Sequence, residues 1–576
     1  MLTRYAKWLL VPTLLVSAAC SERQDEQAAM QPVPDYVDLA LVNGGIYTVD
    51  ADRSWAEAAA VRDGVFVRVG NNAEIEALIG PQTRVIDLAG RMALPGFHDA
   101  HVHTMDGGFA LAGCQLDGLD SVQAIVEKVT ACAVEMDKGW LEGHAFDLSV
   151  FGQDGPNKSL LDAISSVRPI VLWASDYHNV WVNSIALELA GITAETPDPP
   201  LGVIERDPDG SPSGTLREAA QDMLRDAMPK PSLETNVAGL RRGIGHLNSL
   251  GVTSYIEGWI SLAGYQAYQA IDRAGDLTAR VVTSLPYGTV FAEHKGEEFW
   301  QVLSSRNDFE SDRVNNDSVK LFLDGVLEGE TAALIEPYLE MNGKRGDLMF
   351  EPEVLNAAVT RLDAMGLQVQ MHAIGDRAVR AGLDAIEAAR QRNGVSDNRH
   401  HIVHLQLIHP DDIGRFAALG ATANFQALWA FPDEYITELN LPVLGEERVQ
   451  RMYPIGSVVR AGGRIVGGSD WNVSSPNPLE AIEVGVRRQD PRTADGPVLN
   501  ENERVSLETM IDAYTINAAW LMHHENSTGS IEVGKRADIV VLDRNLFEIP
   551  VTEINEARVV ETLLDGETVW PAATAE

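Results

Sequence analysis

The sequence predicts an α/β protein, a (β/α)8 TIM-type barrel with a small composite β-sandwich domain formed by both ends of the chain. The middle of the chain carries eight apolar runs, mostly separated by stretches of helical composition, which is typical of parallel strands with intervening helices. Short β-rich segments occur at both ends. The 576 residues exceed the roughly 250 of a simple barrel, which leaves room for a satellite domain.

Composition favours a large packed core and argues against a nucleic-acid partner. Hydrophobic residues make up 45% of the chain, and 84 acidic against 45 basic residues give a formal net charge of −39. A polyanionic phosphate backbone is repelled by such a chain. We therefore expect a small-molecule ligand and no nucleic acid, and the sequence indicates no particular oligomeric state.

Residues 1–20 have the pattern of an export signal. Arg4 and Lys7 precede an apolar run that is too short to span a bilayer as a mature helix, and Cys20 follows small residues. The segment resembles a bacterial lipoprotein signal, in which Cys20 becomes the lipidated first residue. Ser21 then favours outer-membrane sorting. The alternative is an ordinary secretory signal cleaved near Ala19, which would release the protein into the periplasm.

Residues 21–35 are polar, contain proline and have no periodicity, so we interpret them as a tether. Beyond Cys20, the chain holds two cysteines, Cys114 and Cys132. A strand-like run at 113–119 precedes an amphipathic helical pattern at 121–133, which would pack back on that strand. In an oxidising compartment a disulfide between Cys114 and Cys132 is expected, and two buried free thiols are the alternative.

Two clusters of β-type sequence predict the sandwich domain. The runs at 36–50 and 58–70 alternate in polarity and break at Asn-Gly, Gly-Gly and Asp-Gly, as hairpins do. A second cluster closes the chain with "TGSIEVGKRADIVVLDRN" and "RVVETLLDGETVW". We therefore assign residues 36–92 and 525–576 to one sandwich built from both ends.

The barrel is assigned to residues 93–524, with an insertion of about residues 120–245 between its first two strands. The eight expected strands are "RMALPGFHDAHVH" (91), "VTSYIEG" (252), "ARVVTSL" (279), "SVKLFLDG" (318), "LQVQMHAIGD" (367), "HHIVHLQ" (400), "ATANFQA" (421) and "RIVGGSD" (464). Because the carboxyl ends of barrel strands converge on one pocket, polar residues at these ends are expected to meet.

His101 and His103 are two residues apart, so on a strand both face the same side, whereas His98 faces away from them. Two imidazoles on one face suit a shared metal ion. Taken alone, the pair also fits a polar strand end with solvated histidines.

Four more residues favour a metal site over solvated histidines. Lys320, His372, His404 and Asp470 each lie within or at the end of another expected strand. A buried lysine alone is costly, and four histidines, a lysine and an aspartate at five strand ends are best explained by a divalent metal.

These motifs resemble the amidohydrolase superfamily, in particular its YtcJ-like branch (amidohydrolase family 3). The resemblance rests on "ALPGFHDAHVH", "SVKLFLDGVLEGETAAL", "QVQMHAIGDRAV", "RHHIVHLQLI", "GGSDW" and "AYTINAAWLMHHENSTGSIEVGKRADIVVLD", in that order from residue 37 to about 570. It implies the following metal ligands: His101, His103, Lys320 as N6-carboxylysine, His372, His404 and Asp470. His400, His401 and His409 miss the ligand position of their strand and are left as surface or supporting residues.

The resemblance implies two zinc ions and a hydroxide between them as the nucleophile. Asp470 would take the proton of that hydroxide and deliver it to the leaving amine. The expected enzyme is an amidohydrolase, a hydrolase acting on carbon–nitrogen bonds but not peptide bonds. Its candidate substrates are N-acyl amino acids, N-substituted formamides, small peptides and cyclic amides.

A further catalytic candidate is His178, in "VLWASDYHNVWVNSIAL", which resembles the branch's motif around a histidine and an asparagine. It would contact the substrate or its oxyanion, and the alternative is a histidine packed beside Trp173 and Trp181. Four other residues are candidates for orienting the metal ligands: His144, Asp324, Glu328 and Asp376.

Two other functions fit the same residues. A lactonase or carbamate hydrolase would use the same metal site on a different bond. A non-catalytic metal- or ligand-binding lipoprotein would use the barrel without turnover, although such a protein should have lost at least one ligand. Should Lys320 not bridge the metals, Glu328 or Glu330 is the next candidate for that place.

Overall fold

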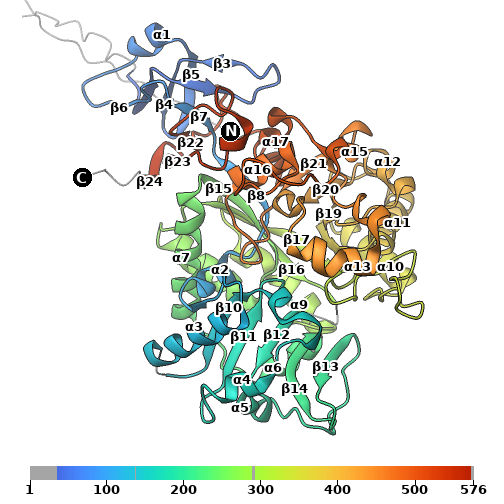
Figure 1. Ribbon diagram of the computed structural model, residues 1–576. Helices are drawn as coiled ribbons and strands as arrows, with labels where there is room; N and C mark the ends of the chain where they lie inside the picture. Colours follow the sequence, from blue (N-terminus) through green and yellow to red (C-terminus); the bar gives the residue numbers. More distant parts are fainter. Residues whose placement is uncertain (1–35, 137, 289–291, 572–576) are drawn as a thin grey trace, which may run out of the picture.

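The computed structural model describes residues 36–136, 138–288 and 292–571 (Figure 1). The expected signal at 1–20, with Cys20, and the expected tether at 21–35 lie outside the described residues. Figure 1 shows three regions: strands from both ends of the chain lie together at one end, the barrel occupies the middle, and an inserted sheet lies at the opposite end. None of the helices in the described ranges is long and apolar enough to cross a membrane.

Eight parallel strands form a nearly closed barrel, which confirms the predicted fold class. The strands are β8 (Phe97–Val102), β15 (Val252–Glu257), β16 (Arg280–Pro286), β17 (Val314–Phe322), β18 (Gln368–Ala373), β19 (His401–His404), β20 (Thr422–Phe425) and β21 (Arg464–Gly467), paired in that order. Beyond the end of β21, the Asp470 amide donates a 2.7 Å hydrogen bond to the carbonyl of His101 and so links the last strand to the first.

Helices cover the outside of the barrel. Those that connect its strands are α7 (Leu233–Ser249), α8 (Leu262–Arg273), α9 (Glu297–Ser305), α10 (Pro352–Ala364), α11 (Asp376–Asn393), α12 (Pro410–Leu419) and α15 (Ile455–Arg460). Helix α11 shows why such segments are helical: Asp376 lies in its first turn, and Arg390 and Arg392 lie in its last, so the charges match the helix dipole. Further helices are α13 (Leu441–Leu444), α14 (Glu446–Val449), α16 (Pro478–Arg487), α17 (Leu507–Ala513) and α18 (Ile516–Leu521).

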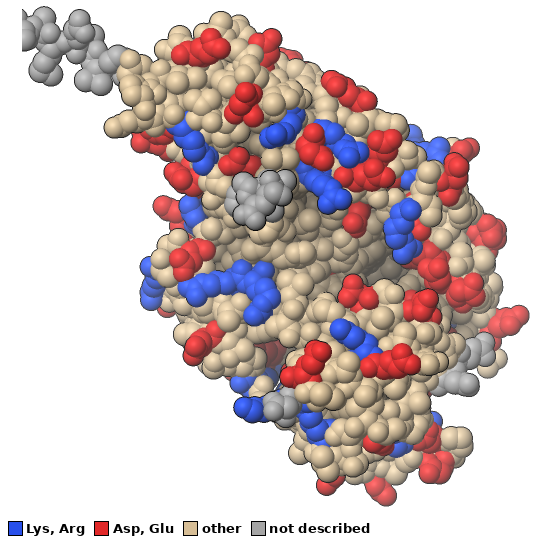
Figure 2. All heavy atoms as spheres, turned by 60° about the vertical axis from the view of Figure 1, so that its left-hand side comes forward, with Lys and Arg blue, Asp and Glu red and all other residues tan. Residues whose placement is uncertain are grey.

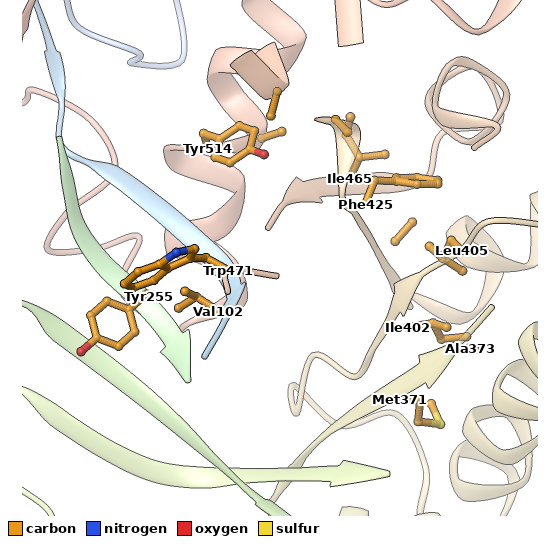
Figure 3. Close-up of a cluster of buried hydrophobic side chains, with 14 of the residues drawn as sticks. Val102, Tyr255, Met371, Ala373, Ile402, Leu405, Phe425, Ile465, Trp471 and Tyr514 are labelled. Carbon is orange, nitrogen blue, oxygen red and sulfur yellow. The ribbon is translucent and has the colours of Figure 1, made fainter. Parts of the chain in front are cut away.

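The largest core lies between the strands and these helices. Its side chains come from several barrel strands, among them Val102, Tyr255, Met371, Ile402 and Phe425 (Figure 3). Every residue of β8, β15, β16 and β18 is buried, so these strands do not alternate between a buried and an exposed face. About half of their residues are nevertheless polar, and such buried polar groups need hydrogen-bond partners or a ligand.

The ends of the chain form two packed sheets, as expected. One has the order β5 (Val65–Gly70), β4 (Ala58–Arg62), β1 (Leu39–Val42) and β6 (Arg84–Asp87), with α1 (Asn72–Glu76) beside it. The other has the order β24 (Glu567–Pro571), β23 (Val559–Leu564), β22 (Ile539–Leu542), β7 (Met92–Pro95), β2 (Gly45–Tyr47) and β3 (Trp55–Ala56). The second sheet contains strands from both ends of the chain.

Two details of the sandwich prediction are wrong. The run at 36–50 is not a hairpin, because β1 and β2 belong to different sheets and the chain crosses between them at Asn43 and Gly44. A Cβ on Gly44 would lie 2.2 Å from the Leu88 side chain, so the glycine permits a close crossing and not a tight hairpin turn. The expected boundary at residue 93 falls inside β7, so strand pairing ends the sandwich part at Pro95 and not at residue 92.

The insertion between β8 and β15 follows α2 (Thr104–Ala110) and contains a third sheet. Its order is β13 (Gly202–Arg206), β14 (Pro212–Glu218), β12 (Asn179–Val182), β11 (Ile170–Ala174), β10 (Leu141–Phe146) and β9 (Cys114–Gln115). Its helices are α3 (Val122–Glu135), α4 (Lys158–Asp162), α5 (Ser184–Leu189) and α6 (Ala220–Ala227). The sheet begins at Cys114, earlier than the expected start near residue 120. A disulfide joins Cys114 on β9 to Cys132 on α3.

Candidate metal centre

Four of the predicted ligands meet at the carboxyl ends of the barrel strands. Oδ1 of Asp470 lies 3.2 Å from Nε2 of His101 and 3.1 Å from Nε2 of His103. Nδ1 of His404 lies 3.7 Å from the second oxygen of Asp470. His101, His404 and Asp470 are buried, and one potential ligand atom from each lies within 4.8 Å of the others. His98 is absent from this cluster, as predicted, because its ring binds the carbonyl of Gly96 and the Thr528 hydroxyl.

The chemistry of this cluster fits a cation. Burial lowers the pKa of His101 to about 3, so its imidazole is neutral at pH 7. Burial alone would raise the pKa of Asp470, but the imidazoles of His101, His103 and His404 hold it well below its usual value. Nε2 of His101 and Oδ1 of Asp470 are buried without a hydrogen-bond partner. A neutral imidazole nitrogen and a carboxylate oxygen that converge in this way suit a divalent ion between them.

Two glutamines orient the imidazoles. Gln426 on the loop after β20 accepts a 2.8 Å hydrogen bond from Nδ1 of His404, which leaves Nε2 of that ring for a ligand. The Gln370 amide nitrogen lies 2.9 Å from Nδ1 of His101, and Oε1 of the same amide is buried without a partner. Turning this amide so that Oε1 accepts the Nδ1 proton satisfies both groups and leaves Nε2 of His101 with its lone pair.

His372 and Lys320 line the same cavity. Nε2 of His372 donates to the carbonyl of Gly325 at 3.1 Å, which leaves Nδ1 as the nitrogen free for a metal, and its ring centroid lies 4.6 Å from that of His404. Lys320 on β17 is 1% exposed, and burial lowers the pKa of its amine to about 7, although Asp470 opposes this shift. Neither residue is part of the three-residue group within 4.8 Å.

Two glycines make room for His101. A Cβ on Gly258, after β15, would lie 2.6 Å from Cε1 of His101 and 2.7 Å from Cε1 of His103. A Cβ on Gly468, after β21, would lie 2.8 Å from the backbone nitrogen of His101. Any larger residue at either position would displace the ring, so these glycines are part of the site.

The cluster lies in the wall of a cavity of about 1070 Å³. Barrel strand ends supply one part of the lining, and the inserted region supplies another, including Trp173, Tyr177 and Arg225. One face of the molecule, hollowed near its centre, carries scattered acidic side chains with basic side chains among them (Figure 2).

His178 lies in the cavity wall at the start of β12. Its ring centroid is 5.4 Å from that of His372, and its Nδ1 lies 2.7 Å from Oε2 of Glu218. Burial would lower the pKa of His178, but the carboxylates of Glu218 and Asp176 raise it to about 9. A protonated imidazole is therefore held beside the candidate metal ligands. The sequence pattern placed His178 near the site but did not indicate Glu218, which is 40 residues away along the chain.

The remaining candidates have separate places. Asp324 accepts backbone hydrogen bonds from Ala333, Ile374 and Gly375 and lies 3.6 Å from His372. His144 lies 3.3 Å from the Tyr177 hydroxyl. The partners of the others are as follows: Glu328 with Asn440, Glu330 with Lys344, Asp376 with the amide of Ile335, His400 with Asp363, and His409 with the amide of Asp411. Of these five residues, only Glu328 lines the cavity. His401 is buried and does not line the cavity.

The barrel, the satellite sandwich and a histidine–carboxylate cluster at the strand ends define a metal-dependent hydrolase. The sequence matches the family model described as "Amidohydrolase family" over residues 84–570. It is 29% identical over 541 residues to the putative amidohydrolase YtcJ of Bacillus subtilis (strain 168), covering 92% of this chain and 99% of that protein. It is 28% identical over 547 residues to the N-substituted formamide deformylase of Arthrobacter pascens, covering 92% and 97%.

Another relative is the protein LONG AFTER FAR-RED 3 of Arabidopsis thaliana, 29% identical over 554 residues and covering 94% of this chain and 93% of that protein. Among solved structures, an uncharacterized metal-dependent hydrolase from Pyrococcus furiosus is 26% identical with a TM-score of 0.68, covering 88% of this chain and 99% of that one. The chain belongs to the amidohydrolase family. The expected class, a hydrolase acting on carbon–nitrogen bonds but not peptide bonds, is thereby confirmed.

Proposed function

We propose that this chain hydrolyses an amide or similar carbon–nitrogen bond of a small molecule at a site that holds two divalent ions, with zinc as the expected metal. The observation that carries the proposal is the pair of buried, unpartnered atoms Nε2 of His101 and Oδ1 of Asp470, 3.2 Å apart. When bound there, a divalent ion polarises a carbonyl oxygen and lowers the pKa of a water molecule. The formamide deformylase relative makes N-substituted formamides reasonable first substrates to test.

Asp470 is the proposed general base and acid. Its carboxylate is ionised at neutral pH, because surrounding imidazoles keep its pKa well below the usual value. An oxygen of Asp470 accepts a proton from the attacking water as the carbon–oxygen bond forms. The same proton is then donated to the leaving nitrogen as the carbon–nitrogen bond breaks, so Asp470 ends the cycle ionised.

Lys320 is proposed to be carboxylated on Nζ and to bridge two metals. The side chain is almost fully buried in the cavity wall, and an ammonium there would repel divalent ions. A neutral amine can add carbon dioxide through a new N–C bond and release a proton to solvent, which gives a carbamate anion that can bind metals. Carboxylation replaces a positive charge, which would repel the metal ions, with a negative charge, which attracts them.

His178 and Glu218 are proposed to stabilise the oxyanion. Glu218 accepts a hydrogen bond from Nδ1 of His178 and keeps the ring protonated, so a positive charge is held in the cavity wall. A positively charged donor is most useful where negative charge develops during the reaction. This assignment makes the inserted region part of the catalytic apparatus.

We further propose that the protein is exported and anchored to the outer membrane through a lipid on Cys20. The support is the signal-like sequence at 1–20 with Arg4, Lys7 and the small residues before Cys20. Replacement of Cys20 by serine should move the protein from the membrane fraction to the soluble fraction without loss of specific activity. Recovery of the unmutated protein in the soluble fraction would refute the anchor.

A substrate panel tests the proposed reaction. Purified full-length protein in detergent is assayed against formamides, N-acyl amino acids and cyclic amides, with lactones, esters and carbamates as the competing class. We expect turnover of carbon–nitrogen substrates, loss of that turnover on chelation, and recovery with zinc. Preference for lactones or carbamates would assign the alternative reaction, and no turnover with a fully loaded metal site would contradict the proposed function.

A further inference from the structure

Arg225 on α6 lines the cavity from the inserted region. Its Cζ lies 4.3 Å from the ring centroid of Trp173 and 5.7 Å from that of Trp259. The indole of Trp173 lies against the guanidinium face, and this leaves the N–H groups on the edge of the plane as the donors available for a ligand.

The donors of Arg225 are poorly satisfied by the protein. Its Nε is buried without a hydrogen-bond partner, and its Nη2 makes one long hydrogen bond of 3.3 Å to the side-chain oxygen of Gln221. No ion pair within 4.0 Å joins its guanidinium to a carboxylate among the residues that the structure describes. A partly buried guanidinium whose Nε is buried without a partner is costly unless a ligand supplies acceptors.

Three carboxylates influence Arg225 electrostatically, and two of them are bound to another group. The three are Asp106, Asp222 and Glu142. Asp106 accepts a 2.9 Å hydrogen bond from the Trp259 indole, and Asp222 pairs with Lys295 at 3.3 Å. Glu142 is partly buried, and burial raises the pKa of its carboxyl group. These acids therefore moderate the charge of Arg225 without occupying its donors.

An aromatic wall connects Arg225 to the metal centre. The Trp259 ring is close to both groups: its centroid lies 5.7 Å from Cζ of Arg225 and 5.6 Å from the His103 ring centroid. A substrate whose reacting bond lies at the metal centre would extend along this indole and reach Arg225 with its far end. The apolar indole also favours a flat or aliphatic middle portion.

We propose that Arg225 binds a carboxylate on the part of the substrate remote from the bond that is cleaved. This inference deepens the proposed function and rests on it. A carboxylate matches the edge of a guanidinium in a bidentate arrangement, which a neutral amide or ester does not reproduce. The substrate class is therefore an anionic amide: a cleavable carbon–nitrogen bond at one end, an apolar spacer, and a carboxylate at the other.

Matched substrates test the proposal. Each pair has the same cleavable formamide or acetamide group and the same aryl or alkyl spacer, and ends in either a carboxylate or a primary carboxamide. The full-length metal-loaded protein should favour the carboxylate roughly 10- to 100-fold in kcat/KM, mainly through KM, because hydrogen bonds to charged groups have this strength. In Arg225→Gln the two substrates should become equal to within about threefold, and Arg225→Lys should lie between, since it keeps the charge but loses the fork.

Arg217→Gln is the matched control. Arg217 is also an arginine of the inserted region, but it pairs with Glu205 at 2.7 Å and does not line the cavity. Its substitution should leave the carboxylate preference unchanged. A purely structural role for Arg225 would lower kcat/KM for both substrates by the same factor and preserve the preference. That result, or a wild-type enzyme that does not distinguish the pair, would overturn the proposal.

Direct binding separates this inference from the proposed function. 4-Phenylbutyrate and 4-phenylbutyramide, which lack a cleavable substituted amide, are titrated into the metal-loaded wild type and Arg225→Lys. We expect the wild type to bind the carboxylate more tightly and the variant to lose most of that difference. If the wild type hydrolyses neither member of any pair but shows this pattern, the reaction is wrong and the carboxylate site stands. Equal binding of the two probes by the wild type refutes the carboxylate site.

Discussion

The barrel strand ends and the inserted region build two sides of one cavity by different means. The barrel side gathers ligand-type residues whose lone pairs face one another, as at His101 and Asp470. The inserted side presents donors, with Arg225 stacked on Trp173 and His178 held by Glu218. In the proposed function the barrel side holds the metal and transfers the proton, and the inserted side stabilises the oxyanion through His178 and selects the substrate through Arg225. Substitutions on the two sides of the cavity should therefore have different kinds of effect on the protein.

Asp470→Asn should have the largest effect. The amide keeps the shape of the side chain but cannot accept and return a proton, so kcat should fall by about 10³-fold or more. Circular dichroism and thermal unfolding should show a folded protein. Activity close to that of the wild type would remove the proton-transfer role and, with it, the claim that the barrel side performs the reaction.

Gln370→Leu should have the next largest effect, on metal affinity. Gln370 is the group beside Nδ1 of His101, and residues that orient metal ligands typically contribute about 10- to 100-fold in affinity. Competition with a chelator of known affinity measures this change, and Gln370→Glu, which retains an acceptor oxygen, should restore part of it. Unchanged affinity in both variants would show that Gln370 does not fix the tautomer of His101.

His144→Gln, on the inserted side, should have little effect at neutral pH and a measurable one in acid. Burial lowers the pKa of His144 to about 4, whereas the unfolded chain has a value near 6.5. Below pH 6.5 the unfolded state binds a proton that the folded state does not, so the free energy of unfolding falls as pH decreases toward 4. His144→Gln should not show this part of the decrease in the free energy of unfolding, which is on the order of 2 kcal/mol at pH 5.

Denaturant unfolding at pH 7.5 and pH 5, with chelator present so that metal release does not contribute, measures that difference. Identical acid sensitivity in the wild type and His144→Gln would mean that the ring is protonated or exposed in the folded state.

The sequence predicted the barrel and the strand ends at which its candidate ligands lie, because those signals are local. His101 and His103 share a face on any strand, and each later ligand lies in or just after its own apolar run. The inserted side and the supporting residues depend on contacts between distant positions. Gln370 and His101 are in contact although 269 residues separate them along the chain. For Arg225, the sequence shows only an arginine in a helical segment, and its contact with Trp173 is visible only in the folded structure.

The wrong hairpin at Asn43 and Gly44 has a related cause. Asn-Gly favours a tight turn, but the same residues also allow a chain to pass closely over a neighbour, here Leu88. Local sequence does not distinguish these uses, because the deciding atom lies 44 residues further along the chain.

The metal content of the purified protein, measured by mass spectrometry on the wild type and on Lys320→Ala in parallel, tests the central claim most directly. The claim is that residues at the barrel strand ends form a divalent metal site on which hydrolysis depends. We expect about two divalent ions per wild-type chain, and loss of both metal and activity in Lys320→Ala, with partial recovery on adding short carboxylic acids. Active wild-type protein without a stoichiometric metal would contradict the account.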